Sequence, residues 1–382
     1  MGKPVNIAVL STAHIHTKGF LENITTTDDG RKAYAIWDDQ ADRGRRYAQQ
    51  FGSTFVADIK QVLRDPAVDG FLICAENTRH LPLLKQVMAL GKPVLCDKPL
   101  VTTVSELKQV QRLLAAHRKT TLFCGYFQPF GGQMLAIKQM IRDGTLGHIT
   151  HVRFRSAHHA AYGHWFDNPD LHWFIQPKLS GGGALMDMGA HAVHLLAHLC
   201  GPAKRAWAVV ANRSGIYKTV DDHGIAQIEY ASGVLGTVEA AWIHQGGPGG
   251  LEVHGSEGAI WQQGGTYVFG KPGQEAQPIT ALPDKPKTVD RLVAAIRGEL
   301  TAAELAEDLV ACQQAVAVMA AAYAAKTTGK WMPVAKGPVA EKAKKLAVTV
   351  NAKPKAQAKS KGKTKAKSKA KPKPKPKPKP KK

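Results

Sequence analysis

Long apolar runs are missing from this sequence: no stretch reaches the roughly eighteen residues that a helix needs to cross a bilayer. We therefore expect no membrane span. Cysteine is also scarce, with five residues that are widely spaced, odd in number and free of any C-x-x-C pair. This pattern argues against a disulfide framework. Because no apolar leader with a small-residue cleavage site precedes the first strand-like run, we expect a cytoplasmic, reducing location.

Acidic residues are almost absent from the end of the chain. Residues 336–382 contain nineteen lysines and a single acid, Glu341, and so carry +18 of the net charge of +22. The same stretch lacks aromatic side chains, so it cannot bury enough apolar surface to offset the entropy of ordering. We predict a disordered tail over residues 335–382. It either binds polyanions such as nucleic acid weakly and without base specificity, or is a solvated tail with no partner.

Short apolar runs in the first third of the chain have the length of buried strands. They cover residues 5–10, 32–37, 68–75, 93–96 and 121–124, with amphipathic helical patterns between them at 43–51, 81–90 and 104–117. Continuous apolar strands that alternate with helices are typical of a parallel sheet covered on both faces. We predict a doubly wound dinucleotide-binding (Rossmann) domain over residues 1–125, in an α/β chain.

The pattern changes after residue 126. Several strand-like runs alternate apolar and polar residues, as half-exposed strands do; they lie at 148–155, 205–212, 224–230, 234–243 and 251–255. Helical patterns cover residues 133–143, 184–199 and 302–325. We predict an α+β domain over residues 126–334, with an open antiparallel sheet that serves substrate binding and oligomerisation.

The turn after the first strand lacks the glycines that let a backbone approach a pyrophosphate. The three glycine positions hold Ser11, Ala13 and His16. The second strand ends at Asp38 and Asp39, where a carboxylate would accept hydrogen bonds from the ribose of NAD and repel the 2′-phosphate of NADP. The residues alone leave two alternatives open: a cofactor site, or a turn that binds nothing beside two solvated acids.

Two further segments carry groups suited to proton transfer. Lys98 follows the fourth strand, at the edge where open parallel sheets place their ligands. Asp187 and His191 follow a run of three glycines and are spaced i, i+4, so they share one face of a helix. A carboxylate can orient a histidine that exchanges a proton near neutral pH. The alternatives are a surface lysine and a capped helix whose polar residues are structural.

Histidines crowd the stretch between residues 158 and 198. His191, His194 and His198 fall within reach of one helical face, so a zinc or iron site is one interpretation. No H-E-x-x-H pattern accompanies them, and we expect no metal. The preferred interpretation is a polar sugar cleft lined by these histidines with Tyr162, Trp165 and Trp173; histidines on exposed loops remain the alternative.

Several of these motifs occur in the order found in one enzyme family. They are Asn77 and His80 in an Asn-x-x-His loop, Gly91 to Pro99 (GKPVLCDKP), Asp143 to Gly147 (DGTLG) and Gly181 to His191 (GGGALMDMGAH). Over roughly residues 4–334 the chain resembles the glucose–fructose oxidoreductase and inositol dehydrogenase family, Gfo/Idh/MocA. The resemblance implies hydride transfer between NAD, less so NADP, and a hydroxyl-bearing carbon of a sugar, cyclitol or related polyol.

The resemblance also implies roles for single residues. His191 would take the proton from the substrate hydroxyl, Lys98 would stabilise the reacting oxygen, Asp187 would orient its neighbours, and Pro99 would be cis. The implied cofactor contacts are Ser11, Ala13, His14, Asp38, Asn77, His80 and Lys98. The implied substrate contacts are Lys98, Tyr126, Trp165, Trp173, Asp187, His191 and His194. A homodimer or homotetramer is implied, and a metal is not.

The chain departs from the family pattern at several positions. Asp97 replaces the usual Glu, His194 stands where an Asp is usual, and Gln128 lies near a usual Arg. Two other functions therefore stay open. One is an NAD-dependent glycosidase of the same family that works by oxidation and elimination. The other is a non-catalytic nucleotide- or sugar-binding regulatory protein, which the glycine-poor turn favours.

Overall fold

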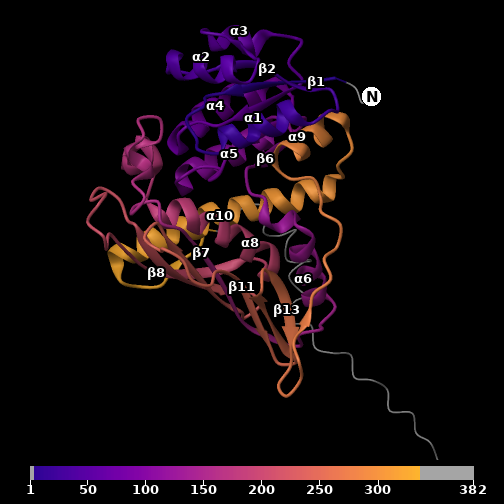
Figure 1. Cartoon of the computed structure of the whole chain (residues 1–382), viewed down its shortest axis with the longest axis vertical. Coiled ribbons are helices and arrows are strands. Elements are labelled where there is room, and N and C mark those ends of the chain that lie inside the picture. The colour runs from indigo at the N-terminus through magenta and orange to yellow at the C-terminus, as the bar shows by residue number, and fades with distance from the viewer. Residues whose placement is uncertain (1–3, 336–382) are drawn as a thin grey trace, which may run out of the picture. The chain divides into compact units, whose positions relative to one another are not determined.

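The computed structural model describes residues 4–335, and the predicted basic tail lies outside the described residues (Figure 1). The first part of the chain forms a six-stranded parallel sheet in the order β3-β2-β1-β4-β5-β6. Its elements are β1 (Val5–Leu10), α1 (Thr17–Thr26), β2 (Arg31–Trp37), α2 (Ala41–Gln50), β3 (Thr54–Phe55), α3 (Ile59–Arg64), β4 (Gly70–Ile73), α4 (His80–Val87), β5 (Val94–Cys96), α5 (Val104–Ala116) and β6 (Leu122–Cys124). The strand order reverses between β1 and β4, which is where such sheets bind ligands. The predicted Rossmann architecture is confirmed.

The second part of the chain forms a nine-stranded sheet in the order β14-β13-β12-β11-β7-β10-β9-β8-β15. Its strands are β7 (Ile149–Ala157), β8 (Ala203–Ala211), β9 (His223–Tyr230), β10 (Leu235–Ala241), β11 (Gly250–Gly255), β12 (Gly258–Gln263), β13 (Thr266–Gly270), β14 (Gln277–Pro278) and β15 (Met332–Pro333). Residues on β9 alternate strictly between half-buried and buried, as the sequence pattern predicts.

The sheet is mixed and not purely antiparallel, because β7 and β10 run in the same direction. The other pairs in this sheet are antiparallel. A parallel pair needs a long crossover. Here the connection from β7 to β10 includes a helix and two strands, which gives the chain room to return in the same direction.

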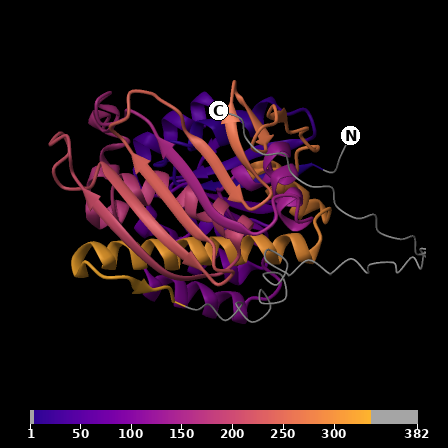
Figure 2. The ribbon, with the colours of Figure 1, turned by 90° about the horizontal axis from the view of Figure 1, so that it is seen from below.

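Five α-helices accompany the second sheet in the chain or follow it. They are α6 (Gly132–Arg142), α7 (Pro177–Ser180), α8 (Ala190–Cys200), α9 (Thr288–Arg297) and α10 (Ala302–Thr328). Figure 2 shows α10 running across the strands of the second sheet. Short single turns also precede α8: 3-10 turns at Trp165–Asp167 and His172–Ile175, and a π-helical turn at Leu185–Gly189. The segment from residue 158 to residue 189 thus contains these short turns and the four-residue helix α7.

Two helices occupy places that sequence patterns alone do not give. Helix α9 packs its Val289 and Leu292 into the core beneath β1 and α1, so a late segment completes the first domain. Helix α10 is long and apolar enough to cross a membrane by composition, but 67% of its apolar window is buried inside the protein. All five cysteines are buried and free, in agreement with the expected absence of disulfides.

Candidate active site

Lys98, Asp187 and His191 come together where the parallel sheet meets helix α8. Lys98 follows β5, and the Lys98–Pro99 peptide bond is cis, as the family resemblance implies. Asp187 lies in the π-helical turn before α8, and His191 lies in the first turn of that helix. The Lys98 ammonium donates a hydrogen bond to Asp187 Oδ1, and the indole of Trp242 donates to Asp187 Oδ2 at 2.9 Å. Both carboxylate oxygens of Asp187 are therefore engaged.

The charges of this group are set by burial and by Lys98. Burial raises the pKa of the Asp187 carboxyl, but the charge of Lys98 and the hydrogen bonds from Lys98 and Trp242 outweigh burial and hold that pKa well below its usual range. Burial lowers the pKa of His191 well below 6.5, and the nearby Lys98 charge lowers it further. The site thus holds an ion pair beside a neutral imidazole, whose Nδ1 is buried without a hydrogen-bond partner among the described residues.

The run of three glycines before this turn has a packing reason. A Cβ at residue 183 would lie 1.9 Å from the carbonyl oxygen of Asp221, so only glycine fits there. The Asp221 carboxylate accepts hydrogen bonds from the backbone N–H groups of Gly183 and Leu185, at 3.1 and 2.9 Å. It therefore caps the N-terminal end of the helical segment that carries Asp187. Neither Asp221 nor Trp242 has a local sequence signal, because both act across the fold.

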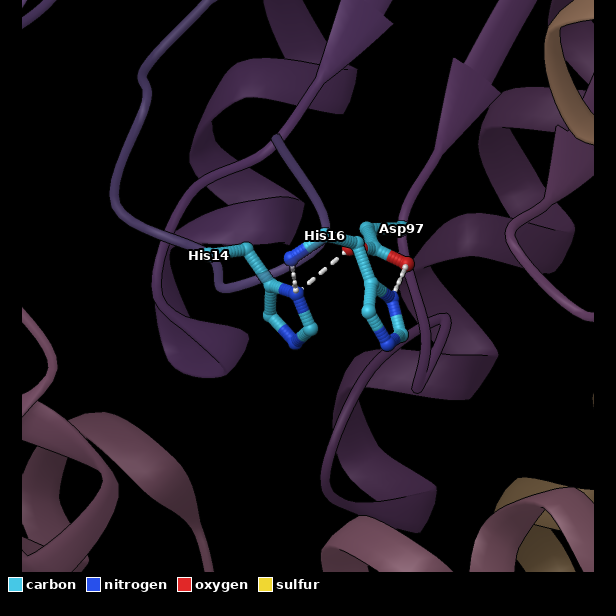
Figure 3. Close-up of side chains that lie close together, drawn as sticks. All are labelled: His14, His16 and Asp97. Atoms are coloured by element: carbon cyan, nitrogen blue, oxygen red, sulfur yellow. Dashed lines mark hydrogen bonds and ion pairs between the residues drawn. The ribbon is translucent and has the colours of Figure 1, made fainter. Parts of the chain in front are cut away.

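The turn after β1 lies against the same site. Ser11 adopts the left-handed conformation, with φ of 68°, at a position where the dinucleotide fingerprint has glycine. The side chains of His14 and His16 both approach the carboxylate of Asp97, which precedes Lys98 (Figure 3). The two rings lie 4.5 Å apart between centroids. His16, which stands at a glycine position of the fingerprint, and His14 are thus both directed at the strand end that carries Lys98.

A segment of the second domain covers this turn. The indole of Trp173 donates a hydrogen bond to the carbonyl oxygen of Ala13 at 3.0 Å, and its ring packs on His14. Asn77, a predicted cofactor contact, donates to the carbonyl oxygen of Ser180 at 2.8 Å. His80, another predicted contact, has its ring nitrogens 2.8 and 3.1 Å from backbone carbonyl oxygens of Pro99 and Ala75. In this structure these residues join the two domains and brace the loop that carries Lys98.

Asp38 is placed at the end of β2 as expected, but its oxygens are occupied. It accepts hydrogen bonds from the Arg43 guanidinium at 2.8 and 2.9 Å and from the hydroxyl of Thr12 at 2.6 Å. Backbone N–H groups of Thr12 and Gln40 donate to it as well, both at 2.7 Å. Asp38 therefore fixes the turn after β1 and has no free acceptor for a ribose hydroxyl. Its predicted role as a ribose contact stays a prediction, and Arg43 supplies a partner that the strand-end motif does not reveal.

A cavity of about 380 Å³ lies beside Asp38, between the first sheet and the covering segment. Its polar lining comes from both parts of the chain and includes Gln40, Arg43, Glu76, Arg79, Asp170 and Gln176. Asp39 borders this region with a side chain that is 33% exposed and paired with Arg79. Of the two carboxylates at the end of β2, Asp39 is therefore the more exposed, and Asp38 is buried.

The predicted substrate contacts differ in exposure: Trp165 is partly exposed, whereas His194 and Trp173 are buried. Trp165 is 36% exposed and stacks on His158, with ring centroids 4.9 Å apart. His194 is fully buried, stacks on Tyr126 at 4.1 Å and lies 3.1 Å from the Asp308 carboxylate of α10. Its ring therefore belongs to the packing between α8 and α10. Trp173 is buried too, and covers the turn after β1.

The structure does not bring together the three histidines of the metal interpretation, His191, His194 and His198. The rings of His194 and His198 both reach Asp308, at 3.1 and 3.4 Å. The ring of His191 instead faces His16, with centroids 6.1 Å apart, and Tyr126. These histidines divide between the packing of α8 on α10 and the candidate active site.

A parallel sheet of dinucleotide-binding topology is joined to a mixed sheet, and a buried Lys–Asp pair with a nearby histidine lies at their junction. Comparison with known proteins agrees. Residues 5–126 match the model described as the oxidoreductase family with an NAD-binding Rossmann fold, and residues 134–261 match the GFO/IDH/MocA C-terminal domain. The chain belongs to the GFO/IDH/MocA oxidoreductase family.

Named relatives are distant. The chain is 25% identical over 236 residues to 1,5-anhydro-D-fructose reductase of Ensifer adhaerens, covering 60% of this chain and 68% of that protein. It is 25% identical over 240 residues to levoglucosan dehydrogenase of Pseudarthrobacter phenanthrenivorans, covering 56% and 60%. It is 24% identical over 275 residues to inositol 2-dehydrogenase 1 of Saccharopolyspora erythraea, covering 65% and 78%. Parts of these relatives, in the second case two fifths, thus lie outside the alignment.

Solved structures share the whole fold. GenD2 from gentamicin A biosynthesis, in complex with NAD, superposes with a TM-score of 0.71 at 23% identity, covering 88% of this chain and 98% of that one. Levoglucosan dehydrogenase in complex with NADH and levoglucosan superposes with a TM-score of 0.70 at 18% identity, covering 87% and 100%. At these identities the likeness establishes the architecture of residues 4–335.

Proposed function

We propose that this chain is an NAD-dependent oxidoreductase that transfers a hydride from a hydroxyl-bearing carbon of a sugar, cyclitol or related polyol. One observation carries the proposal: Lys98, Asp187 and His191 meet at the ligand-binding edge of the parallel sheet. The printed activities of the relatives, a sugar reductase, a sugar dehydrogenase and an inositol dehydrogenase, support the substrate class.

Each of the three residues has a charge that suits a different role in the reaction. Bound NAD would accept the hydride. His191 is neutral and holds a buried nitrogen that is unpartnered among the described residues, so it is suited to take the proton from the substrate hydroxyl. The Lys98 ammonium stabilises negative charge that develops on that oxygen. Asp187, held by Trp242, keeps the ammonium in place.

The residues present fit the adenosine end of NAD. The cavity beside β2 is bordered by the carboxylates of Asp39, Glu76 and Asp170, and its two arginines are both paired with acids. An acidic surrounding favours the ribose of NAD and repels the 2′-phosphate of NADP. The N-terminal end of α1 has no capping side chain, and its dipole would favour the pyrophosphate there; the N–H groups of His16 and Thr17 are bonded to His14.

We further propose a homo-oligomer and a reducing compartment. Val209 on β8 and Leu235 on β10 are 42% and 39% exposed. The strand register places both on the same face of the second sheet. A second copy would cover these two apolar side chains, and the five free thiols suit a reducing location.

Binding and turnover test the proposal together. The full-length chain is titrated with NAD and NADP while tryptophan fluorescence is recorded, since Trp173 covers the turn after β1. Binding of NAD in preference to NADP, followed by NADH formation with a member of a sugar and polyol panel, is the expected result. Failure to bind either dinucleotide overturns the proposal.

A non-catalytic binding protein is the second candidate, because Trp173 and its neighbours cover the cofactor turn. Lys98 is 1% exposed, so a rearrangement near it must precede any contact with substrate or nicotinamide. Removing the cover distinguishes the two candidates. If Trp173→Ala binds NAD more tightly yet no panel compound is oxidised by it or by the unaltered protein, the binding function is favoured.

A further inference from the structure

The turn after β1 brings together three groups that bind transition metals. His14 Nδ1 lies 2.7 Å from Asp97 Oδ2, and His16 Nδ1 lies 3.2 Å from Asp97 Oδ1 (Figure 3). One ligand atom from each residue lies within 4.8 Å of the other two. Metal–ligand distances near 2.0–2.2 Å require ligand atoms roughly 3 to 3.5 Å apart. Small shifts of the side chains would therefore place all three around one ion.

The burial of the three residues is unusual for groups with this chemistry. The side chains of His14 and Asp97 are fully buried, and that of His16 is 32% exposed. Among the described residues, His14 Nε2 has no hydrogen-bond partner, and Asp97 Oδ2 is approached only by the His14 ring. Buried polar atoms of this kind normally have a partner, from protein, water or an ion. The Asp97 carboxylate lies next to Lys98 in sequence, yet it is Asp187 that pairs with that lysine.

The surroundings leave space for the carboxylate and shield one side from water. A Cβ at residue 125 would lie 2.3 Å from Asp97 Oδ1, so Gly125 leaves room for that oxygen, which also accepts a hydrogen bond from the Lys98 backbone N–H at 2.8 Å. Trp173 and Phe174 pack on the ring of His14, with centroids 5.7 and 5.4 Å away. An apolar cover of this kind orients the ligands and limits solvent access. The open side lies at His16.

We propose that His14, His16 and Asp97 form a binding site for a divalent transition-metal ion such as Zn²⁺, Co²⁺ or Fe²⁺. Two imidazoles and one carboxylate select these ions over Mg²⁺ and Ca²⁺, which prefer oxygen ligands alone. The remaining coordination positions open on the His16 side, where the ring of His191 lies 6.1 Å away between centroids. The ion would stand at the N-terminal end of α1, in the turn where a dinucleotide fingerprint has glycine and no side chain.

The site does not depend on the proposed hydride transfer, and its test uses metal alone. The full-length chain, purified with a chelator and dialysed free of it, is titrated with Co²⁺ and followed by calorimetry and by visible d–d absorption. We expect one tight equivalent per chain, displaced by Zn²⁺ and unaffected by excess Mg²⁺. His16→Ala is the main variant, because its partly exposed side chain can be removed with little loss of packing. It should weaken this equivalent by at least about tenfold.

A matched control comes from a second group of possible ligands, His223, Glu239 and His244, on the open face of the second sheet. Arg155 donates to His244 Nδ1 and so adds a competing cation there. His223→Ala should therefore leave the tight equivalent unchanged. Asp97→Asn should abolish it, with circular dichroism to verify folding; if that variant does not fold, His14→Ala replaces it.

Two results overturn the metal site. One is the absence of a tight Co²⁺ equivalent in the unaltered chain. The other is a tight equivalent that survives His16→Ala or is lost in His223→Ala. Titration with NAD in the absence of metal is a separate measurement. Loss of NAD binding there contradicts the proposed function and leaves the metal site standing.

Discussion

The buried Lys98–Asp187 pair makes a prediction that links stability to activity. Only 2% of the Lys98 side chain and 11% of the Asp187 side chain are exposed. Removing one member of a buried ion pair costs about 3–5 kcal/mol, because the other charge is left without compensation. Lys98→Met and Asp187→Asn should each lower the free energy of unfolding by about this amount. That loss is a large part of the roughly 5–15 kcal/mol that holds a domain folded.

The double variant should recover part of the loss. With both charges gone, the amide that replaces the Asp187 carboxylate can still accept the Trp242 hydrogen bond, and no charge is buried alone. We expect a coupling energy of about 2–3 kcal/mol between the two positions, within the range for residues in contact. Turnover behaves differently: all three variants should lose on the order of 10²–10³ in rate, because each lacks the fixed cation at the reacting oxygen or the carboxylate that holds it there.

Urea unfolding followed by tryptophan fluorescence measures the coupling, and NADH formation measures the rate. Cys200→Ser, at a buried site with no ionised partner, serves as a control for the general cost of core substitution. Additive effects of the two single variants, within about 0.5 kcal/mol, would refute the buried pair. Near-normal turnover in Lys98→Met would remove that lysine from the mechanism.

Three further outcomes follow from the electrostatics of the site. His191→Asn should lower turnover by about 10²-fold and flatten the pH–rate profile, and an unchanged profile would assign the base elsewhere. Asp39→Asn should raise the binding of NADP relative to NAD by roughly fivefold. Asp38→Asn should weaken the binding of both cofactors alike, because Asp38 holds the turn after β1. Dissociation constants of both variants for both cofactors test this difference. Burial raises the pKa of Asp308, but hydrogen bonds from His194 and His198 outweigh burial and hold that pKa below its usual range. A depressed folded pKa stabilises the protein above the unfolded value near 3.9, and this stability is lost as pH falls through the folded pKa. The urea midpoint should drop as the pH falls from about 5 to 2. If the midpoint of Asp308→Asn depends on pH as steeply as that of the unaltered protein, this explanation is wrong.

The layout of the first domain was predictable because buried parallel strands leave continuous apolar runs, as in residues 5–10 and 68–75. The role of helix α9 was not. Its amphipathic pattern marks a helix, but nothing local says that Val289 and Leu292 pack beneath β1, at the opposite end of the sequence. The parallel pairing of β7 with β10 is also non-local, since alternation of polar and apolar residues is the same in either direction.

In the candidate site, too, some residues were predictable from local sequence motifs and others depend on contacts between distant parts of the chain. Lys98, Asp187 and His191 lie in motifs whose spacing is visible in the sequence, and the structure places them together. The hydrogen bond from Arg43 to the Asp38 carboxylate depends on how α2 packs against β2. The hydrogen bond from Trp242 to Asp187 joins residues that are 55 positions apart in the sequence. Such partners decide which carboxylate is free and which is fixed, and only the folded chain reveals them.

The central claim, hydride transfer from a hydroxyl-bearing carbon to NAD, can be measured directly. The full-length chain is incubated with NAD and with panel sugars and polyols that carry deuterium on their carbinol carbons, and the nicotinamide product is analysed by mass spectrometry and NMR. The account predicts that one deuterium moves from the oxidised carbon to C4 of the nicotinamide ring, on one face, while the hydroxyl proton goes to the protein and solvent. Oxidation without deuterium at C4, or no transfer while NAD is demonstrably bound, would contradict it.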